Sequence, residues 1–203
     1  KNMTAGEAGC LITNNVDIRD RAHAFKDVGR RPGGERWEYP RLGWNYRTSE
    51  YLAAILLKRL PDLEPQIQRR NENAAFLTRE LEGIEGITPP ILKDYVTQHG
   101  YHLYMMQYEP SGFGGKSRDQ FLEALQAEGI ASSPGYQRPL TDEGALKSVA
   151  ERYPHMVNRM PCPNVEQASS HSIWLYQYML LGEHEDLNDI IEAIAKIKAA
   201  FTT

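Results

Sequence analysis

The sequence lacks the features that mark secreted and membrane proteins. Only two cysteines, Cys10 and Cys162, occur in 203 residues. They form no disulfide framework, and we expect both thiols to be reduced, as in the cytosol. No apolar run is long enough to cross a bilayer, and no signal-peptide pattern is present. These absences favour a cytoplasmic protein that is not held in a membrane.

An excess of basic residues is also missing. Lys and Arg number 23 against 27 Asp and Glu, a formal net charge of −4 that argues against a nucleic-acid surface. His99 and His102 lie three residues apart without a third ligand nearby, so we expect no metal site. The sequence has no glycine-rich nucleotide loop and no internal repeat. With 41% hydrophobic and 25% charged residues, it is typical of a globular protein.

The stretch with the most chemical information is the first nine residues, Lys-Asn-Met-Thr-Ala-Gly-Glu-Ala-Gly. Small residues let the backbone approach a ligand closely. A lysine beside such a turn, when shielded from water, can act as a nucleophile in Schiff-base chemistry with a carbonyl. The other interpretation of Lys1 is a solvated charge at a frayed chain end.

A second informative stretch runs from Gly43 to Glu50. Thr48 or Ser49 can cap a following helix, and a loop that leads into a helix N-terminus is suited to bind phosphate. The amide of Asn45, just before it, can both donate and accept hydrogen bonds. Alternatively, Asn45 and its neighbour Arg47 only order the turn.

These motifs resemble the sugar aminotransferase family called DegT/DnrJ/EryC1/StrS. The family pattern is Lys, two residues, Thr, a small residue, Gly, Glu, Gly, Gly, and this sequence departs from it only at Ala8. The resemblance covers nearly the whole chain in the right order, through residues 43–50, Ala53-Ala54, His102-Leu103-Tyr104, Gly129-Ile130, Gly135-Tyr136 and the Trp174 segment.

The resemblance implies roles for five residues. Lys1 falls on the lysine that holds pyridoxal 5'-phosphate (PLP). Asn45 falls on the residue that reaches the cofactor phosphate of the partner subunit, which implies a homodimer with shared active sites. Arg47 is a candidate for the carboxylate of the amino donor. His102 and Tyr136 are candidate substrate contacts, although a lone histidine on a strand can equally be packed and hydrogen-bonded.

The function implied by the resemblance is that of a PLP-dependent aminotransferase. The amino donor is glutamate or glutamine, and the acceptor is a keto-sugar or a cyclitol. Related sugar dehydratases carry His in place of the lysine, so Lys1 favours transamination. The tail from Ser172 to Ala195 is similar to the cyclitol and aminobenzoate-type subgroup. The alternative is a non-catalytic or regulatory relative, or an isolated fragment, that keeps the fold and the dimer interface.

The expected fold class is mixed α/β (α+β), the C-terminal part of a fold type I PLP-dependent transferase. Residues 1–60 are expected to end the large cofactor-binding domain, 61–86 to form a linking helix, and 87–203 to form a small α+β domain. The chain has no initial Met, and Lys1 is expected deep inside a larger fold. We therefore interpret the chain as part of a longer protein whose upstream half carries the cofactor-stacking aromatic residue, the acid that pairs with the pyridine nitrogen, and the first phosphate contacts.

Hydrophobic periodicity predicts the elements. Residues 29–42, rich in Gly, Pro and Arg, are either a surface loop or a loop that brings Arg30, Arg31, Arg36 and Arg41 to a neighbouring active site. Prolines 61 and 65 predict a break between two helices. We expect strands over 8–13, 87–93 (at a sheet edge), 101–108, 130–133 and 172–179, and helices over 17–26, 49–60, 63–81, 117–128, 141–160 (irregular) and 186–201.

Overall fold

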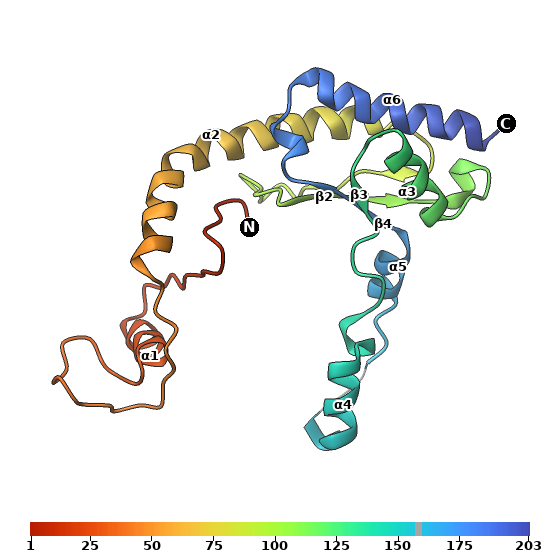
Figure 1. Ribbon diagram of the computed structural model, residues 1–203. Coiled ribbons are helices and arrows are strands. Elements are labelled where there is room, and N and C mark those ends of the chain that lie inside the picture. The colour runs from red at the N-terminus through yellow and green to blue at the C-terminus, as the bar shows by residue number, and fades with distance from the viewer. Residues whose placement is uncertain (157–159) are drawn as a thin grey trace. The chain divides into compact units, whose positions relative to one another are not determined.

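The computed structural model describes residues 1–156 and 160–203, which form two compact units, Lys1–Glu64 and Pro65–Thr203 (Figure 1). In chain order the elements are α1 (Val16–Lys26), α2 (Glu50–Leu81), β1 (Ile87–Thr88), β2 (Leu103–Tyr108), η1 (Pro110–Phe113), α3 (Arg118–Ala127), β3 (Ser132–Ser133), η2 (Leu140–Asp142), α4 (Gly144–Arg152), η3 (Pro154–Met156), α5 (Pro163–His171), β4 (Ser172–Tyr176), η4 (Met179–Leu181) and α6 (His184–Phe201).

Helix α1 confirms the helix expected over residues 17–26. It begins where the side chain of Asn15 accepts hydrogen bonds from the amides of Asp17 (2.9 Å) and Ile18 (3.2 Å). After it ends, Gly29 adopts φ +91° and donates its amide to the carbonyl of Ala24. This left-handed glycine is a common way to end a helix.

The strand expected over residues 8–13 is wrong. These residues form no strand, and the side chains of Leu11 and Ile12 are 60% and 92% exposed. A strand needs a neighbour to satisfy its backbone hydrogen bonds, and residues 1–64, all of which the structure describes, contain no other strand. The apolar run is therefore irregular chain on the surface of the first unit.

The break expected between helices 49–60 and 63–81 is also wrong, because α2 is one helix of 32 residues with Pro61 and Pro65 inside it. Each proline lacks the amide that would bond the carbonyl four residues earlier, which leaves the carbonyls of Leu57 and Pro61 without that helical partner. The helix start agrees with the sequence, since the amide of Leu52 lies 3.5 Å from the Ser49 hydroxyl.

The second unit is built on a four-stranded antiparallel sheet of order β1-β2-β4-β3. In β2, Tyr104, Met106 and Tyr108 are buried, whereas Met105 is exposed, so the strand has a core face and an open face. Strand β1 lies at the edge and ends just before Pro89, which confirms the expected edge strand in a shorter form.

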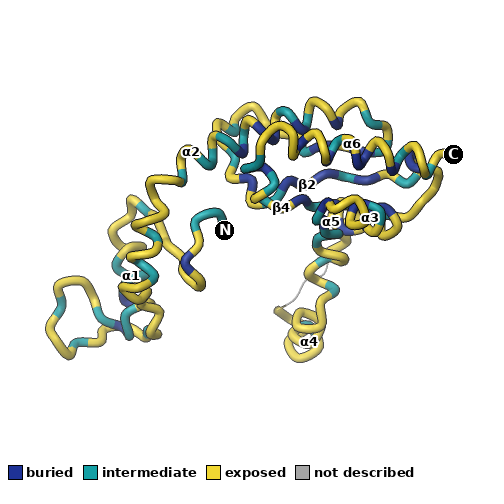
Figure 2. The backbone as a smooth tube through the Cα atoms, turned by 45° about the horizontal axis from the view of Figure 1, so that its top comes forward, coloured by how far each residue is buried: buried dark blue, intermediate teal, exposed yellow. Residues whose placement is uncertain are grey.

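Helices α2, α3 and α6 cover the core face of this sheet. Their buried residues join those of the strands in one hydrophobic cluster, in which Leu77, Phe121 and Ile194 have no exposed surface. Figure 2 shows the buried stretches of these helices turned toward the strands. The core also contains a buried polar contact, in which Arg70 donates to Gln177 Oε1 at 2.6 Å. Burial lowers the pKa of the Arg70 guanidinium.

The remaining elements of the second unit follow the sequence closely. Ser117 caps α3 in a reciprocal capping box with Gln120, and Gly129 follows the helix at φ +85°. The strands expected over 101–108, 130–133 and 172–179 are confirmed as β2, β3 and β4, each shorter than expected. The irregular helix expected over 141–160 appears as η2, α4 and η3, although residues 157–159 lie outside the described part.

Among the helices within residues 1–156 and 160–203, none combines the length and the apolar character needed to cross a membrane.

Candidate active site

The turn that follows Lys1 is open. Lys1 is exposed, and no hydrogen bond or ion pair of its side chain occurs among the described residues. Gly6 adopts φ +82°, and a Cβ atom built on Gly6 or Gly9 would meet nothing within 4 Å. The backbone here is therefore accessible to a ligand, and the lysine amine is free of internal partners. The expected position deep inside a larger fold is not formed by these 203 residues alone.

The loop that carries Asn45 is held by its main chain. Trp44 donates to the carbonyl of Phe25 (2.7 Å), and Tyr46 donates to that of Lys26 (2.8 Å). At Gly43 a Cβ atom would lie 2.3 Å from the carbonyl oxygen of Ala24, so only glycine fits this close approach. The stretch 43–46 is thus pinned to the end of α1.

This arrangement separates the two interpretations of Asn45 and Arg47. Asn45 is exposed, and its side chain has no partner among the described residues, so it does not order the turn. Arg47 does order the turn, because its Nη1 donates to Asp27 Oδ1 at 2.6 Å. The side-chain amide of Asn45 is left unused by the turn and is available to a ligand.

Asp27 is a residue of this site that the sequence did not reveal. The hydrogen bond from Arg47 is the largest effect on the Asp27 carboxyl and lowers its pKa. Burial opposes this change, and the positive charges of Arg47, Arg30 and His23 each make a smaller contribution that also lowers the pKa. One sequence signal was available. An acidic residue at the C-terminal end of a helix opposes the helix dipole, so a specific cationic partner is expected.

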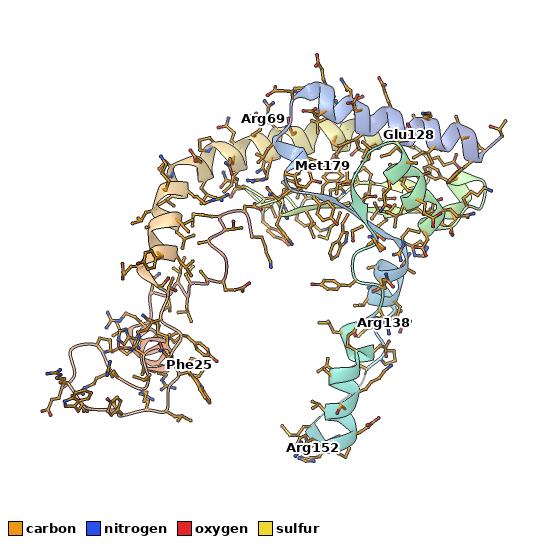
Figure 3. All side chains as sticks on the ribbon, viewed as in Figure 1. Phe25, Arg69, Glu128, Arg138, Arg152 and Met179 are labelled. Carbon is orange, nitrogen blue, oxygen red and sulfur yellow. The ribbon has the colours of Figure 1, made fainter. Side chains whose placement is uncertain are left out.

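A cavity of ≈ 1030 Å³ lies within the first unit. Segment 7–13, helix α1 and the loop from Tyr46 to Ser49 line it, with Arg19, Lys26 and Arg47 as cations and Glu7 as an acid. Neither Lys1 nor Asn45 belongs to the lining. Figure 3 shows Phe25, another lining residue, among the side chains around α1.

The arginine-rich loop 29–42 lies on the surface, with two of its four arginines held internally. Arg30 is hydrogen-bonded to Tyr39, which raises the pKa of its guanidinium. Arg31 pairs with Glu38 at 3.1 Å. Arg36 lies over the ring of Trp37, and Arg41 is exposed without an ion pair in the described chain.

His102 and Tyr136 belong to the second unit. His102, just before β2, is exposed, so it is not the packed strand histidine of the alternative interpretation. Tyr136 is 71% exposed, and its ring meets Trp174 edge-on with the ring centroids 5.2 Å apart. The candidate residues therefore fall into two groups, with Lys1, Asn45 and Arg47 in the first unit.

Comparison with known proteins gives these features a context. The DegT/DnrJ/EryC1/StrS aminotransferase family matches residues 1–195. A putative L-glutamine:3-amino-2,3-dideoxy-scyllo-inosose aminotransferase of Streptomyces kanamyceticus is 32% identical over an alignment of 211 positions that covers 98% of this chain and 50% of that protein. The 3-amino-5-hydroxybenzoate synthase of Amycolatopsis mediterranei is 27% identical, over 96% of this chain and 50% of its own length.

A solved structure extends the comparison to the fold. The sugar aminotransferase from Micromonospora echinospora matches with a TM-score of 0.78 at 21% identity, covering 97% of this chain and 49% of that one. This likeness confirms the expected fold class, a mixed α/β part of a fold type I transferase. The chain spans about half the length of the curated relatives it matches. It belongs to the DegT/DnrJ/EryC1/StrS aminotransferase family.

Proposed function

We propose that the protein is a PLP-dependent aminotransferase that moves an amino group from glutamine or glutamate to a keto-sugar or cyclitol acceptor. Membership of the aminotransferase family supports the reaction type. The relatives named as L-glutamine:inosose aminotransferases and 3-amino-5-hydroxybenzoate synthase support a glutamine donor and a six-membered carbocyclic acceptor. The absence of a membrane-spanning helix among the described residues is compatible with the cytoplasmic location we propose.

The observation that carries this proposal is the unpartnered amine of Lys1 beside an open glycine turn. A primary amine in open space fits a cofactor that is attached through its aldehyde carbon. Bound there, PLP would supply a ring that stores the electrons of the broken bond. Lys1 would then move the proton at the substrate carbon as a general base and acid.

Asn45 would serve a second, neighbouring site. Its side-chain amide, which the turn does not use, would donate to a phosphate oxygen of the cofactor in the partner subunit. Shared sites of this kind require a homodimer. In this arrangement residues 1–60 end the large domain, 61–86 link the domains, and 87–203 form the small domain.

The remaining candidates would contact substrate. Arg47 keeps donors beyond the Nη1 group that Asp27 engages, and its side chain is 46% exposed, so it can still meet the carboxylate of the amino donor. His102 and Tyr136, both exposed, would contact the acceptor from the second unit.

An absorption spectrum of the full-length protein with added PLP tests the proposal. We expect a near-visible band from the lysine-bound cofactor, and we expect glutamine to shift it. The variant Lys1→Ala should lack the band, whereas Lys58→Ala, at an exposed position on α2, should keep it. If the wild-type protein shows no band, the aminotransferase proposal fails and a non-catalytic relative remains.

Mixing two inactive variants tests the shared site. A heterodimer of Lys1→Ala and Asn45→Ala subunits contains one site with both residues intact if Asn45 acts across the dimer. Mixing should then restore transamination from glutamine to a keto-cyclitol such as 2-deoxy-scyllo-inosose. If Asn45 acts within its own subunit, each site of the heterodimer lacks one residue and activity stays absent.

A further inference from the structure

One segment of the second unit leaves the sheet and returns to it. Between β3 and β4 the chain forms an arm, defined here as residues 137–156 and 160–162, before α5 leads back to the sheet. Helix α4 of the arm has no buried residue and packs on η2 and η3 of the same arm. Figure 3 shows Arg138 near the base of the arm and Arg152 at its far end. Packing of its own side chains therefore does not fix the arm to the sheet.

A mostly buried guanidinium lies at the base of this arm. Arg118, the first residue of α3, has a side chain that is 14% exposed. Its Nη1 donates to the carbonyl of Ser169 at 2.6 Å and lies 3.4 Å from the carbonyls of Pro134 and Ser172. The nearest carboxylate, Asp119, is 3.8 Å from Nε and 81% exposed. The guanidinium of Arg118 is thus hydrogen-bonded to main-chain carbonyl groups and, within the described chain, not to a carboxylate. Hydrogen bonds from a charged donor are stronger than those between neutral groups.

The three carbonyl groups lie in the segments that flank the arm on either side. Pro134 lies where the chain leaves β3, and Ser169 and Ser172 lie where it returns through α5 into β4. All three contacts are made by the Nη1 group, whose two hydrogens are held at fixed angles in the guanidinium plane, whereas the ammonium of a lysine is carried on a flexible stem. Arg118 therefore connects the N-terminus of α3 to the segment that leads into the arm, at Pro134, and to the segment that follows it, at Ser169 and Ser172.

Tyr136 is two residues from Pro134, whose carbonyl group contacts Arg118. Gly135, between them, adopts φ +68°, and a Cβ atom there would lie 2.3 Å from the Trp174 ring. The Tyr136 ring then packs edge-on against Trp174 while most of its surface stays exposed. An exposed tyrosine is thus held in one place by contacts with buried or half-buried groups.

We propose that Arg118 is a positioning residue. It fixes both ends of the arm so that Tyr136 is presented to the acceptor, and it does so without touching the substrate. The effect on catalysis rests on the proposed aminotransferase function. The clamp, meaning the contacts of Arg118 with the carbonyls of Pro134, Ser169 and Ser172, is a property of the fold.

The test uses the full-length protein loaded with PLP and the variants Arg118→Met and Arg118→Lys. The two half-reactions are followed separately by absorbance, with glutamine and with 2-deoxy-scyllo-inosose. Because displacement by about 1 Å can cost roughly 100-fold in rate, we expect Arg118→Met to slow the acceptor half-reaction by roughly 10- to 100-fold and the donor half-reaction by less than about twofold. Arg118→Lys, which keeps a charged donor for the Ser169 carbonyl but on a more flexible side chain, should recover part of the loss, and Arg152→Met should behave as wild type.

Limited trypsin digestion supplies a readout that needs no activity. In Arg118→Met, cleavage after Lys147 and Arg152 should accelerate, while cleavage after Lys196 and Lys198 in α6 should keep its wild-type rate. If trypsin cleaves the arm of Arg118→Met at the same rate as in the wild-type protein, Arg118 does not hold the arm in place. Equal slowing of both half-reactions would overturn the positioning role and leave a structural one. If the wild-type protein shows neither half-reaction, the proposed function fails, and the cleavage rates still decide whether Arg118 holds the arm.

Discussion

Arg47 Nη1 donates a 2.6 Å hydrogen bond to Asp27 Oδ1, and this ion pair joins the loop before α2 to the residue that ends α1. The two residues are 20 positions apart, and the main chain between them makes a long surface loop. Four groups meet at this point, because His23 and Arg30 also lie within 4.0 Å of the Asp27 carboxylate. We expect this pair to support the main-chain hydrogen bonds that hold the Asn45 segment.

The first prediction concerns the pH dependence of this pair. The pKa of Asp27 is lowered in the folded state, so its ionised form stabilises the fold above the ordinary aspartate pKa of about 3.9, and the stabilisation is lost as the pH falls through the lowered value. Arg47→Met should therefore speed hydrogen exchange at the amides of Trp44 and Tyr46 at pH 7. The ratio of variant to wild-type exchange should approach one at the most acidic pH that the fold survives.

Asp27→Asn provides the matched control, because it keeps the shape and removes the charge. It should reproduce the faster exchange of Arg47→Met at pH 7, and the double variant should add little to either single change. A constant ratio of exchange rates from neutral to acid pH would show that the ion pair does not hold the Asn45 segment.

The second prediction concerns Tyr108, which is fully buried in β2. Its hydroxyl donates to the carbonyl of Lys116 at 2.8 Å, and burial raises the pKa of Tyr108 to about 12. Tyr108→Phe should lower the free energy of unfolding by about 1 kcal/mol at pH 7, the usual net value of such a bond. Urea denaturation measures this difference.

The same variant has a predicted alkaline signature. The folded-state pKa is raised, so the contribution of the neutral phenol is complete below the unfolded pKa of about 10 and declines as the pH rises from there toward 12. The stability difference between wild type and Tyr108→Phe should therefore shrink above pH 10. Tyr178→Phe, at an exposed position, should show no such convergence.

Local sequence signals predicted the second unit well. The aromatic and apolar residues of 101–108 predicted a strand, and Ser117 with Gly129 predicted the bounds of α3, because these patterns act over a few residues. Strand 8–13 was wrong, because an apolar run becomes a strand only when another strand pairs with it.

The candidate site was predictable only in part. The motif order predicted Lys1 and Asn45 as site residues, and this stays a prediction. The pairing of Asp27 with Arg47 and the contact of Arg118 with Ser169, 51 residues away, follow no periodic pattern. Such contacts depend on how loops fold back on helices, and single-sequence patterns do not contain that information.

The third prediction concerns Pro61, which predicted a break between two helices but lies inside one continuous helix. Pro61 lies in the interior of α2 and cannot donate to the carbonyl of Leu57. Pro61→Ala restores this donor, so we expect the helix to gain up to about 3 kcal/mol, the difference between proline and alanine inside helices. Slower hydrogen exchange at amides of residues 58–64, relative to wild type, would show the gain. An unchanged or faster exchange would mean that α2 is shaped around the proline.

The last prediction compares two glycines, Gly129 and Gly135, to separate the cost of backbone strain from the cost of a steric clash. Gly135 and Gly129 both have positive φ, +68° and +85°, but only at Gly135 would a Cβ atom meet another residue, the Trp174 ring at 2.3 Å. Gly129→Ala should therefore cost only about 1–2 kcal/mol for the left-handed conformation. Gly135→Ala should cost about 1–3 kcal/mol more, because the added methyl group must displace the indole.

Urea denaturation gives the two costs, and near-UV circular dichroism reports the environment of the aromatic rings. Only Gly135→Ala should change the near-UV spectrum, since Trp174 carries Tyr136 on its edge and both rings must move together. Equal costs in the two variants, with an unchanged spectrum, would mean that the loop yields to the methyl group. Tyr136 would then not be held in place by Trp174, and the rigid presentation on which the role of Arg118 depends would be lost.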